Sequence, residues 1–170
     1  KEQDIMTPEL KTAGDKLMYF TIDHDAFDLP DYEQVMKLYD AVYALIQDKK
    51  LKAVYALDAK GLVAAVSKMA FGNQMGVCLE SSLDKDAIFA PAFGDIVAEV
   101  KADTFEELVG EYTLIGEVTN EKAFAYGDVK IGMDDALDAW TKPLEKVFAT
   151  KSAESSDIPV EEKLYDASTV

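Results

Sequence analysis

The sequence predicts a mixed α/β (α+β) domain rather than a doubly wound parallel sheet. Predicted strands and helices alternate in the first half of the chain, and the second half is richer in strands. The 170 residues are 49% hydrophobic, which is enough for one domain with a full core. The chain is organised around residues 51–80, where a strand, a turn, an alanine-rich helix and a second strand follow one another.

The N-terminal part predicts one strand and one helix. Residues 1–15 are polar with little periodicity, and we expect them to be a connector. Residues 16–21 alternate moderately and predict a buried strand. Residues 31–48 predict the clearest helix of the chain, in which Asp31 and Gln34 can form a capping box. Its predicted apolar stripe consists of Val35, Leu38, Tyr39, Val42, Leu45 and Ile46.

The central stretch predicts a helix that lies very close to a sheet. Alanine is frequent in this helix, and small side chains permit close approach. Gly72 or Asn73 is expected to supply the left-handed residue that ends it. The expected bounds are 51–57 for the first strand, 58–61 for the turn, 62–71 for the helix and 75–79 for the second strand.

The second half predicts mainly strands. The expected elements are one helical turn at 85–89, a strand at 95–101, a short helix at 104–109, a strand at 112–119, a hairpin of 123–126 with 129–131, and an amphipathic helix at 134–148. Alternation places Val97 and Glu99 on one face of their strand, and Thr104 with Glu107 can form a capping box. Pro143 should kink or restart the last helix.

The composition argues against several functional classes. The net charge of −16 and the absence of arginine argue against a nucleic-acid surface and against a bidentate phosphate clamp. No apolar run is long enough to span a bilayer, and no signal segment opens the chain. A lone cysteine, Cys78, fits a reducing compartment, so we expect a cytoplasmic location. Because the chain begins with Lys1, we expect a piece of a longer protein.

Two residues with reactive side chains have simpler structural interpretations. His24, the only histidine, lies among Asp23, Asp25 and Asp28, where a metal site or a His–Asp base is imaginable. The loop lacks the glycine and glutamate of an EF-hand and a second histidine, so a solvated loop is expected. Cys78 lies in a predicted strand and is expected to be a small core side chain.

The turn Lys60-Gly61 precedes a helix, where backbone N–H groups favour an anion. One glycine with one lysine is far from the phosphate-binding loop G-x-x-x-x-G-K-[ST], and a plain tight turn is the simpler interpretation. We expect two further acidic pairs, Asp84 with Asp86 and Asp134 with Asp135, to be surface charges. We expect Trp140 to lie in the core.

Several segments together resemble a known protein family. They are the central stretch with its Gly61-Leu62 turn and Met69-Ala70-Phe71-Gly72 helix end, residues 7–11 with Gly14 and Leu17, Leu29-Pro30-Asp31, residues 115–119, and residues 138–148. From about residue 6 to 148 the chain resembles the C-terminal (B-type) domain of the aminoimidazole ribonucleotide synthetase-like superfamily. It is similar in particular to the second such domain of large, single-chain phosphoribosylformylglycinamidine synthases.

The chain departs from this family in the central turn. Family members with a nucleotide site carry His-Asp-x-Ser, an acidic residue and Gly-Gly-Leu there. The replacements are Tyr55 for the histidine, Ala56 for the metal-binding aspartate, Asp58 for the serine, Lys60 for the first glycine, and later Pro91 for a glutamate and Asp95 for an arginine. The resemblance implies a vestigial nucleotide site of Asp58, Lys60 and Gly61, with Asp58 a weak metal candidate and no catalytic residue.

The resemblance also implies an architecture and a function. It implies a mixed sheet with helices mainly on one face, a connector over 1–15, the domain proper over 16–150, and a linker over 151–170 toward a glutaminase domain. The parent enzyme would be an ATP- and Mg²⁺-dependent ligase and glutamine amidotransferase of de novo purine biosynthesis. The domain would be structural, inactive alone and without a cofactor, with neighbouring synthetase-like domains and the glutaminase as partners.

Two alternatives stay open from the residues themselves. One is a stand-alone module that binds ADP and Mg²⁺ at the central turn. The other is a non-enzymatic interaction domain that forms a homodimer through an exposed sheet face. Neither alternative involves nucleic acid or a membrane.

Overall fold

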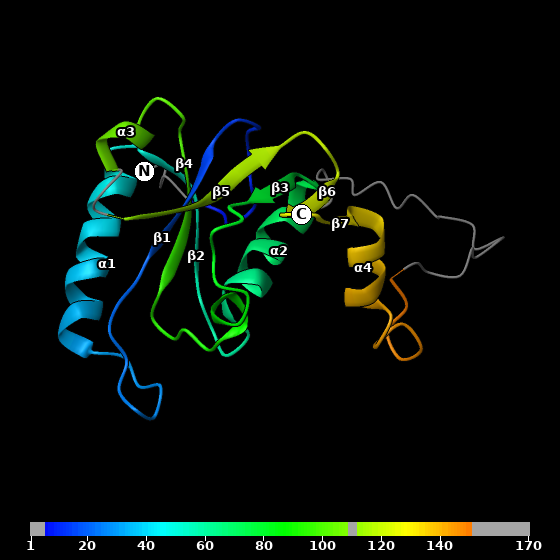
Figure 1. Ribbon diagram of the computed structural model, residues 1–170, viewed down its shortest axis with the longest axis horizontal. Helices are drawn as coiled ribbons and strands as arrows, with labels where there is room; N and C mark the ends of the chain where they lie inside the picture. The colour runs from blue at the N-terminus through cyan, green and yellow to red at the C-terminus, as the bar shows by residue number, and fades with distance from the viewer. Residues whose placement is uncertain (1–5, 109–111, 151–170) are drawn as a thin grey trace, which may run out of the picture. The chain divides into compact units, whose positions relative to one another are not determined.

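A seven-stranded mixed sheet carries the fold (Figure 1). The computed structural model describes residues 6–108 and 112–150, and all seven strands lie in the first of two compact units, Lys1–Leu137 and Asp138–Val170. The strands are β1 (Lys16–Phe20), β2 (Leu51–Ala56), β3 (Gly76–Leu79), β4 (Ile96–Val100), β5 (Thr113–Thr119), β6 (Ala123–Tyr126) and β7 (Val129–Gly132). The helices are α1 (Tyr32–Gln47), α2 (Gly61–Asn73), α3 (Phe105–Leu108) and α4 (Met133–Thr141), with a 3₁₀ turn η1 (Ala87–Phe89).

The order of the strands makes the sheet mixed. It runs β2-β4-β1-β5-β3-β6-β7, and the β3–β6 pair is parallel while the other neighbours are antiparallel. The predicted α/β class is therefore confirmed, and each predicted strand lies within two residues of its expected bounds.

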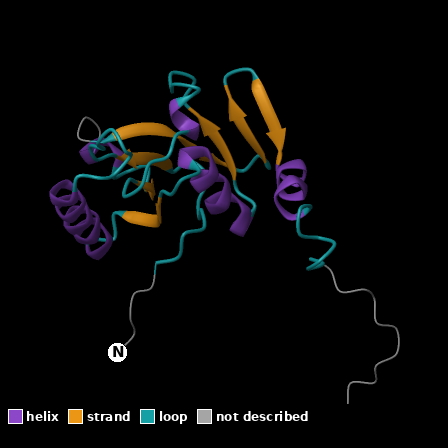
Figure 2. Ribbon diagram, turned by 90° about the horizontal axis from the view of Figure 1, so that it is seen from below, coloured by secondary structure: helices purple, strands orange, loops and turns teal. Residues whose placement is uncertain are grey.

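Side chains of the central strands pack on both faces of the sheet. In β1, Leu17 packs with α2 on one face, and Met18 packs on the opposite face in a cluster with residues of α1 and α3. Figures 1 and 2 show α1 and α2 on different sides of these strands. The resemblance implied helices mainly on one face. The structure places helices on both, because β4 is buried throughout its length and needs cover on both sides.

Helix α1 begins as expected and packs most of its predicted apolar stripe, including Val42, against the sheet. Asp31 Oδ1 accepts hydrogen bonds from the backbone N–H groups of Glu33 (2.9 Å) and Gln34 (3.2 Å). The amide of Gln34 reaches Asp23 Oδ2 (2.8 Å), so the predicted capping box is only half formed. Tyr39, predicted to lie in the buried stripe, is 40% exposed because its position lies on the solvent edge of that stripe.

Helix α2 runs two residues beyond its predicted end. Gln74, with φ of 52°, is the left-handed residue that ends it, so the prediction of Gly72 or Asn73 was wrong. The side chain of Asn73 instead donates a hydrogen bond to the Leu10 carbonyl (2.8 Å). Gly72 lies so close to Glu9 that an added Cβ would be 2.1 Å from its Cγ.

The N-terminal segment packs onto α2. Leu10 is completely buried, and its N–H donates to the Met69 carbonyl (2.9 Å). Residues 6–15 therefore contribute to the core, while the domain boundaries expected from the sequence remain predictions.

The second half follows the predicted strands closely, but the last helix, expected over 134–148, is seven residues shorter at its C-terminal end. The β6–β7 hairpin turns at Gly127, which has φ of 55°. Glu107 pairs with Lys50 (2.7 Å), an ion pair that the capping-box expectation did not include. The helix α4 ends at Thr141, two residues before Pro143, because a residue before proline is disfavoured in helical conformation. Val109 and the expected linker 151–170 lie outside the described residues.

None of the helices in the described ranges is both long and apolar enough to cross a membrane.

Candidate functional site

The central turn joins β2 to α2 and brings the three predicted site residues together. Asp58 Oδ1 accepts a hydrogen bond from the N–H of Lys60 (2.8 Å), and the Asp58 carbonyl accepts one from the N–H of Gly61 (3.2 Å). The second carboxylate oxygen lies 3.2 Å from Lys68 Nζ. The backbone N–H of Lys60 and the Lys68 ammonium hold the pKa of Asp58 below its ordinary value. The carboxylate is thus satisfied by its own chain.

Lys68 was not predicted as part of this site. It is the only charged residue in α2, and its ammonium also lies 5.4 Å from the centroid of the Tyr55 ring. Tyr55 stands where the family carries histidine. A single cation in an otherwise apolar helix was the signal that could have indicated a fixed partner for Asp58.

The start of α2 is covered by a passing backbone. Gly61 has φ of 70°, and a Cβ added to it would lie 2.5 Å from the Ala90 carbonyl oxygen. The N–H of Ala92 donates to the Asp58 carbonyl (3.3 Å). The segment after η1 therefore closes over the turn, and glycine is required at position 61 by both conformation and space.

These residues do not fit a magnesium–nucleotide site as they stand. Mg²⁺ prefers octahedral oxygen ligands, and the turn offers one carboxylate, which already binds Lys60 and Lys68. Ala56 supplies no ligand at the position of the family's aspartate. Within the described ranges, no group of three or more His, Cys, Asp or Glu side chains is placed to hold a metal ion. The turn has the geometry of a packed connection.

The loop around His24 is held by internal hydrogen bonds. His24 Nε2 lies 2.8 Å from the Phe93 carbonyl oxygen. Asp25 Oδ1 accepts hydrogen bonds from the N–H groups of Phe27 (2.7 Å) and Leu29 (3.0 Å). These contacts shape the loop and engage both His24 and Asp25 within it.

Two expected core residues are exposed. Cys78 is paired in register with Glu117 and Ala125, on the sheet face opposite α2, so the prediction of a core cysteine was wrong. Successive side chains of a strand point to opposite faces, so Cys78 faces solvent because its neighbour Val77 faces the core. Trp140 is 50% exposed, so the prediction that it lies in the core was wrong too.

The acidic pairs Asp84 with Asp86 and Asp134 with Asp135 lie at the surface, as predicted. Asp84 Oδ1 accepts hydrogen bonds from the N–H groups of Ala87 (2.8 Å) and Asp86 (2.9 Å). These two hydrogen bonds lower the pKa of Asp84.

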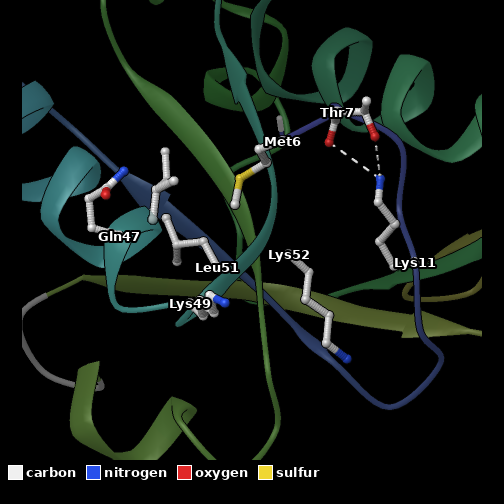
Figure 3. Close-up of a pocket in the computed structure, with 8 residues that line it drawn as sticks. Met6, Thr7, Lys11, Gln47, Lys49, Leu51 and Lys52 are labelled. Atoms are coloured by element: carbon white, nitrogen blue, oxygen red, sulfur yellow. Dashed lines mark hydrogen bonds between the residues drawn. The ribbon is translucent and has the colours of Figure 1, made fainter. Parts of the chain in front are cut away.

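Two cavities of the described residues lie elsewhere. One, of about 340 Å³, is lined mainly by apolar side chains of α2, η1, β6 and β7, and also by the charged side chain of Lys85. The other, of about 280 Å³, lies between the N-terminal segment and the α1–β2 connection. In Figure 3 the Lys11 side chain extends toward Thr7, whose Oγ1 accepts its hydrogen bond (2.9 Å). Neither cavity is lined by Asp58, Lys60 or Gly61.

Glu99 is a completely buried carboxylate on the face of β4 that was predicted for it. Its two oxygens accept hydrogen bonds from the N–H groups of Lys11 (2.7 Å) and Thr12 (2.8 Å). Burial and the neighbouring Asp15 carboxyl raise the pKa of Glu99 to about 7, although the two N–H groups oppose this. Asp15 forms an ion pair with Lys52 (2.5 Å). Glu99 therefore fixes the N-terminal segment on the sheet.

Asp95, which replaces the family's arginine, joins the ends of β1 and β4. Its oxygens accept hydrogen bonds from the Tyr19 hydroxyl (2.5 Å) and the Ile22 N–H (3.1 Å). Burial raises the pKa of Asp95, and the Tyr19 and Ile22 donors and His24 oppose the rise. The same burial and the contact with Asp95 raise the pKa of Tyr19. This pair is an internal polar contact rather than a reactive centre.

The chain is similar to part of a curated enzyme. It is 30% identical over 126 residues to phosphoribosylformylglycinamidine synthase subunit PurL of Limosilactobacillus fermentum. The match includes 69% of this chain and 17% of that protein, so the chain spans about a sixth of its relative. No protein-family model matches the chain. The sequence similarity indicates homology to a part of PurL.

Solved structures show the fold. Phosphoribosylformylglycinamidine synthase II of Thermotoga maritima superimposes with a TM-score of 0.65 at 9% identity, over 77% of this chain and 27% of that one. The hydrogenase maturation protein HypE of E. coli superimposes with a TM-score of 0.56 at 23% identity, over 78% of this chain and 53% of that one. The seven-stranded mixed sheet therefore has the aminoimidazole ribonucleotide synthase-like fold.

Proposed function

We propose that this chain is a structural B-type domain from the second half of a phosphoribosylformylglycinamidine synthase, without catalysis of its own. The observation that carries the proposal is the central turn. Asp58 is neutralised by Lys68 and by the Lys60 N–H, and the backbone near Ala90 leaves no space above Gly61. A turn closed in this way supports packing of α2 on the sheet rather than phosphate binding.

The activity proposed for the parent protein follows from the similarity to PurL. The parent would convert a formylglycinamide ribonucleotide to its amidine with ATP, Mg²⁺ and ammonia derived from glutamine. T. maritima PurL has been solved in complex with ATP, which supports nucleotide use in related proteins. The nucleotide and the metal would be held by other domains, because the only carboxylate in the central turn, Asp58, is already bound to Lys60 and Lys68.

The proposed partners are the domains that adjoin this one in the parent chain. They are the other synthetase-like domains and a glutaminase domain, toward which residues 138–148 would lead. A cytoplasmic location goes with a purine-biosynthetic parent and remains an expectation.

An assay of the isolated chain tests the absence of catalysis. We expect no ADP release above the blank when the chain is mixed with formylglycinamide ribonucleotide, ATP, Mg²⁺ and ammonium, because the turn offers no free metal ligand. A complete phosphoribosylformylglycinamidine synthase serves as the positive control. Turnover by the chain that disappears in Asp58→Ala would contradict the proposal.

A further inference from the structure

The outward face of α1 carries large apolar side chains. They are Tyr32, Met36, Tyr39 and Tyr43, which are 70%, 63%, 40% and 63% exposed. A neighbouring side of the same helix packs Leu38, Val42 and Leu45 against the sheet. The helix thus has two apolar sides, and only one of them is covered by the domain. We call Tyr32, Met36, Tyr39 and Tyr43 the α1 stripe.

The spacing of the α1 stripe is that of a helix-packing seam. Its members follow one another at intervals of four, three and four residues. Alternating intervals of three and four keep side chains on one line of a helix and match the two apolar positions of a heptad. Leu29, 53% exposed, continues the same spacing just before the helix begins. A surface of this shape fits another α-helix lying along α1.

The uncovered part of the sheet is more polar than the α1 stripe. On the face opposite α2, β3, β5 and β7 present Cys78, Glu117 and Lys130. Glu117 forms an ion pair with Lys16 from β1. Monomeric proteins rarely expose contiguous apolar patches of large side chains, and such patches mark interaction sites. The α1 stripe is therefore the more apolar of these two surfaces, and it has the character of an interaction site.

The charges beside the α1 stripe determine what kind of helix fits. With Tyr32 and Tyr39 at d positions of a heptad, Glu33 and Asp40 occupy the e positions that flank the seam, whereas Lys37 occupies a b position farther from it. A second copy of this chain would bring its own Glu33 and Asp40 to the same seam, within a chain of net charge −16. Like charges at flanking positions disfavour pairing, and lysine or arginine at those positions favours it.

We propose that the α1 stripe docks an amphipathic α-helix of another domain or protein, with an apolar seam flanked by lysine or arginine. Burial of the tyrosine rings and Met36 supplies the affinity, and Glu33 and Asp40 select basic partners over a second copy. This docking does not involve the central turn. It can therefore be present or absent independently of nucleotide binding.

A designed peptide tests the proposal directly. The probe is a fluorescein-labelled helical peptide of about three heptads, with leucine at the seam and lysine at the flanks. Fluorescence anisotropy at physiological salt compares it with the same peptide carrying glutamate at the flanks, and with a scrambled peptide of the lysine composition. The scrambled peptide controls for simple attraction of a basic peptide to an acidic chain.

Variants on the outward face of α1 complete the test. We expect the lysine peptide to bind, and Met36→Ser with Tyr39→Ser to weaken binding by about tenfold or more. Ala44→Ser, an exposed change on the same helix outside the α1 stripe, should leave binding unchanged. Circular dichroism confirms that each variant keeps its fold.

Three results would overturn the proposal. They are equal binding of the scrambled peptide, binding that survives the double substitution, and the absence of binding by the lysine peptide. Sedimentation gives a further check: a dimer that dissociates in the double variant would identify a second copy as the occupant, against the charge argument.

Discussion

Gly61→Ala is expected to lower the free energy of unfolding by about 3 kcal/mol or more. Two costs combine at this position. A side chain at φ of 70° is strained, and the new Cβ would lie 2.5 Å from the Ala90 carbonyl oxygen and 2.9 Å from the Phe89 carbonyl carbon. Both neighbours are backbone atoms, which cannot move aside by changing a rotamer. The loop after η1 must shift or α2 must tilt.

Urea unfolding followed by circular dichroism measures this effect, and Gly127→Ala is the matched control. Gly127 also has positive φ, 55°, but an added Cβ there meets nothing within 4 Å. The control should cost about 1–2 kcal/mol, from backbone strain alone. An equal decrease in the free energy of unfolding for the two variants would contradict a steric clash between a Cβ at position 61 and the backbone of residues 88–90.

The free energy of unfolding is expected to fall as the pH rises from about 5 to about 7.5, through titration of Glu99. The pKa of Glu99 is about 7 in the folded chain and near its ordinary value of 4.5 when unfolded. Between these values the folded state binds more protons than the unfolded state. The stabilisation is therefore complete below about pH 4.5 and is lost as the pH rises through 7.

Glu99→Gln separates this carboxylate from the rest of the acidic chain. Glutamine resembles the protonated acid, so urea unfolding at a series of pH values should show a flatter dependence in this variant. Glu117→Gln, at a carboxylate that is 44% exposed, should keep the wild-type dependence. If the free energy of unfolding depended on pH in the same way in the wild type and in Glu99→Gln, titration of Glu99 would not be the cause of the dependence.

Local patterns of the sequence predicted the elements well. Alternation in residues 95–101 located β4 and the face of Glu99, and the position of Asp31 located the start of α1. These features depend on neighbouring residues and on backbone propensities, which a single sequence contains. The fold class followed from the order of the elements.

Features that depend on distant parts of the chain were missed. Cys78 was expected in the core, but its exposure depends on which side of β3 the helix α2 covers. Tyr39 has helical spacing with both the buried side of α1 and the α1 stripe, and the sequence alone does not separate them. The residue that ends α2 is Gln74, and the neighbouring Asn73 instead binds the carbonyl of Leu10, a residue 63 positions earlier.

At the candidate site, too, local features were predicted and contacts with distant residues were not. The sequence located the turn and the replacements within it, such as Ala56 and Lys60. Its closure was not predictable, because Lys68 reaches Asp58 from ten positions along the chain and Ala90 meets Gly61 from another loop.

Isothermal titration of the chain with ADP and with ATP, each with Mg²⁺, tests the proposed structural role most directly. We predict no heat of binding and no thermal shift up to millimolar nucleotide, because Asp58 and the start of α2 are engaged within the fold. A ligand at a hundred times its dissociation constant would add about 2.7 kcal/mol, which a thermal shift detects readily. Micromolar binding that is lost in Lys60→Ala and kept in Lys130→Ala, a surface lysine of β7, would contradict the account and make the turn a working nucleotide site.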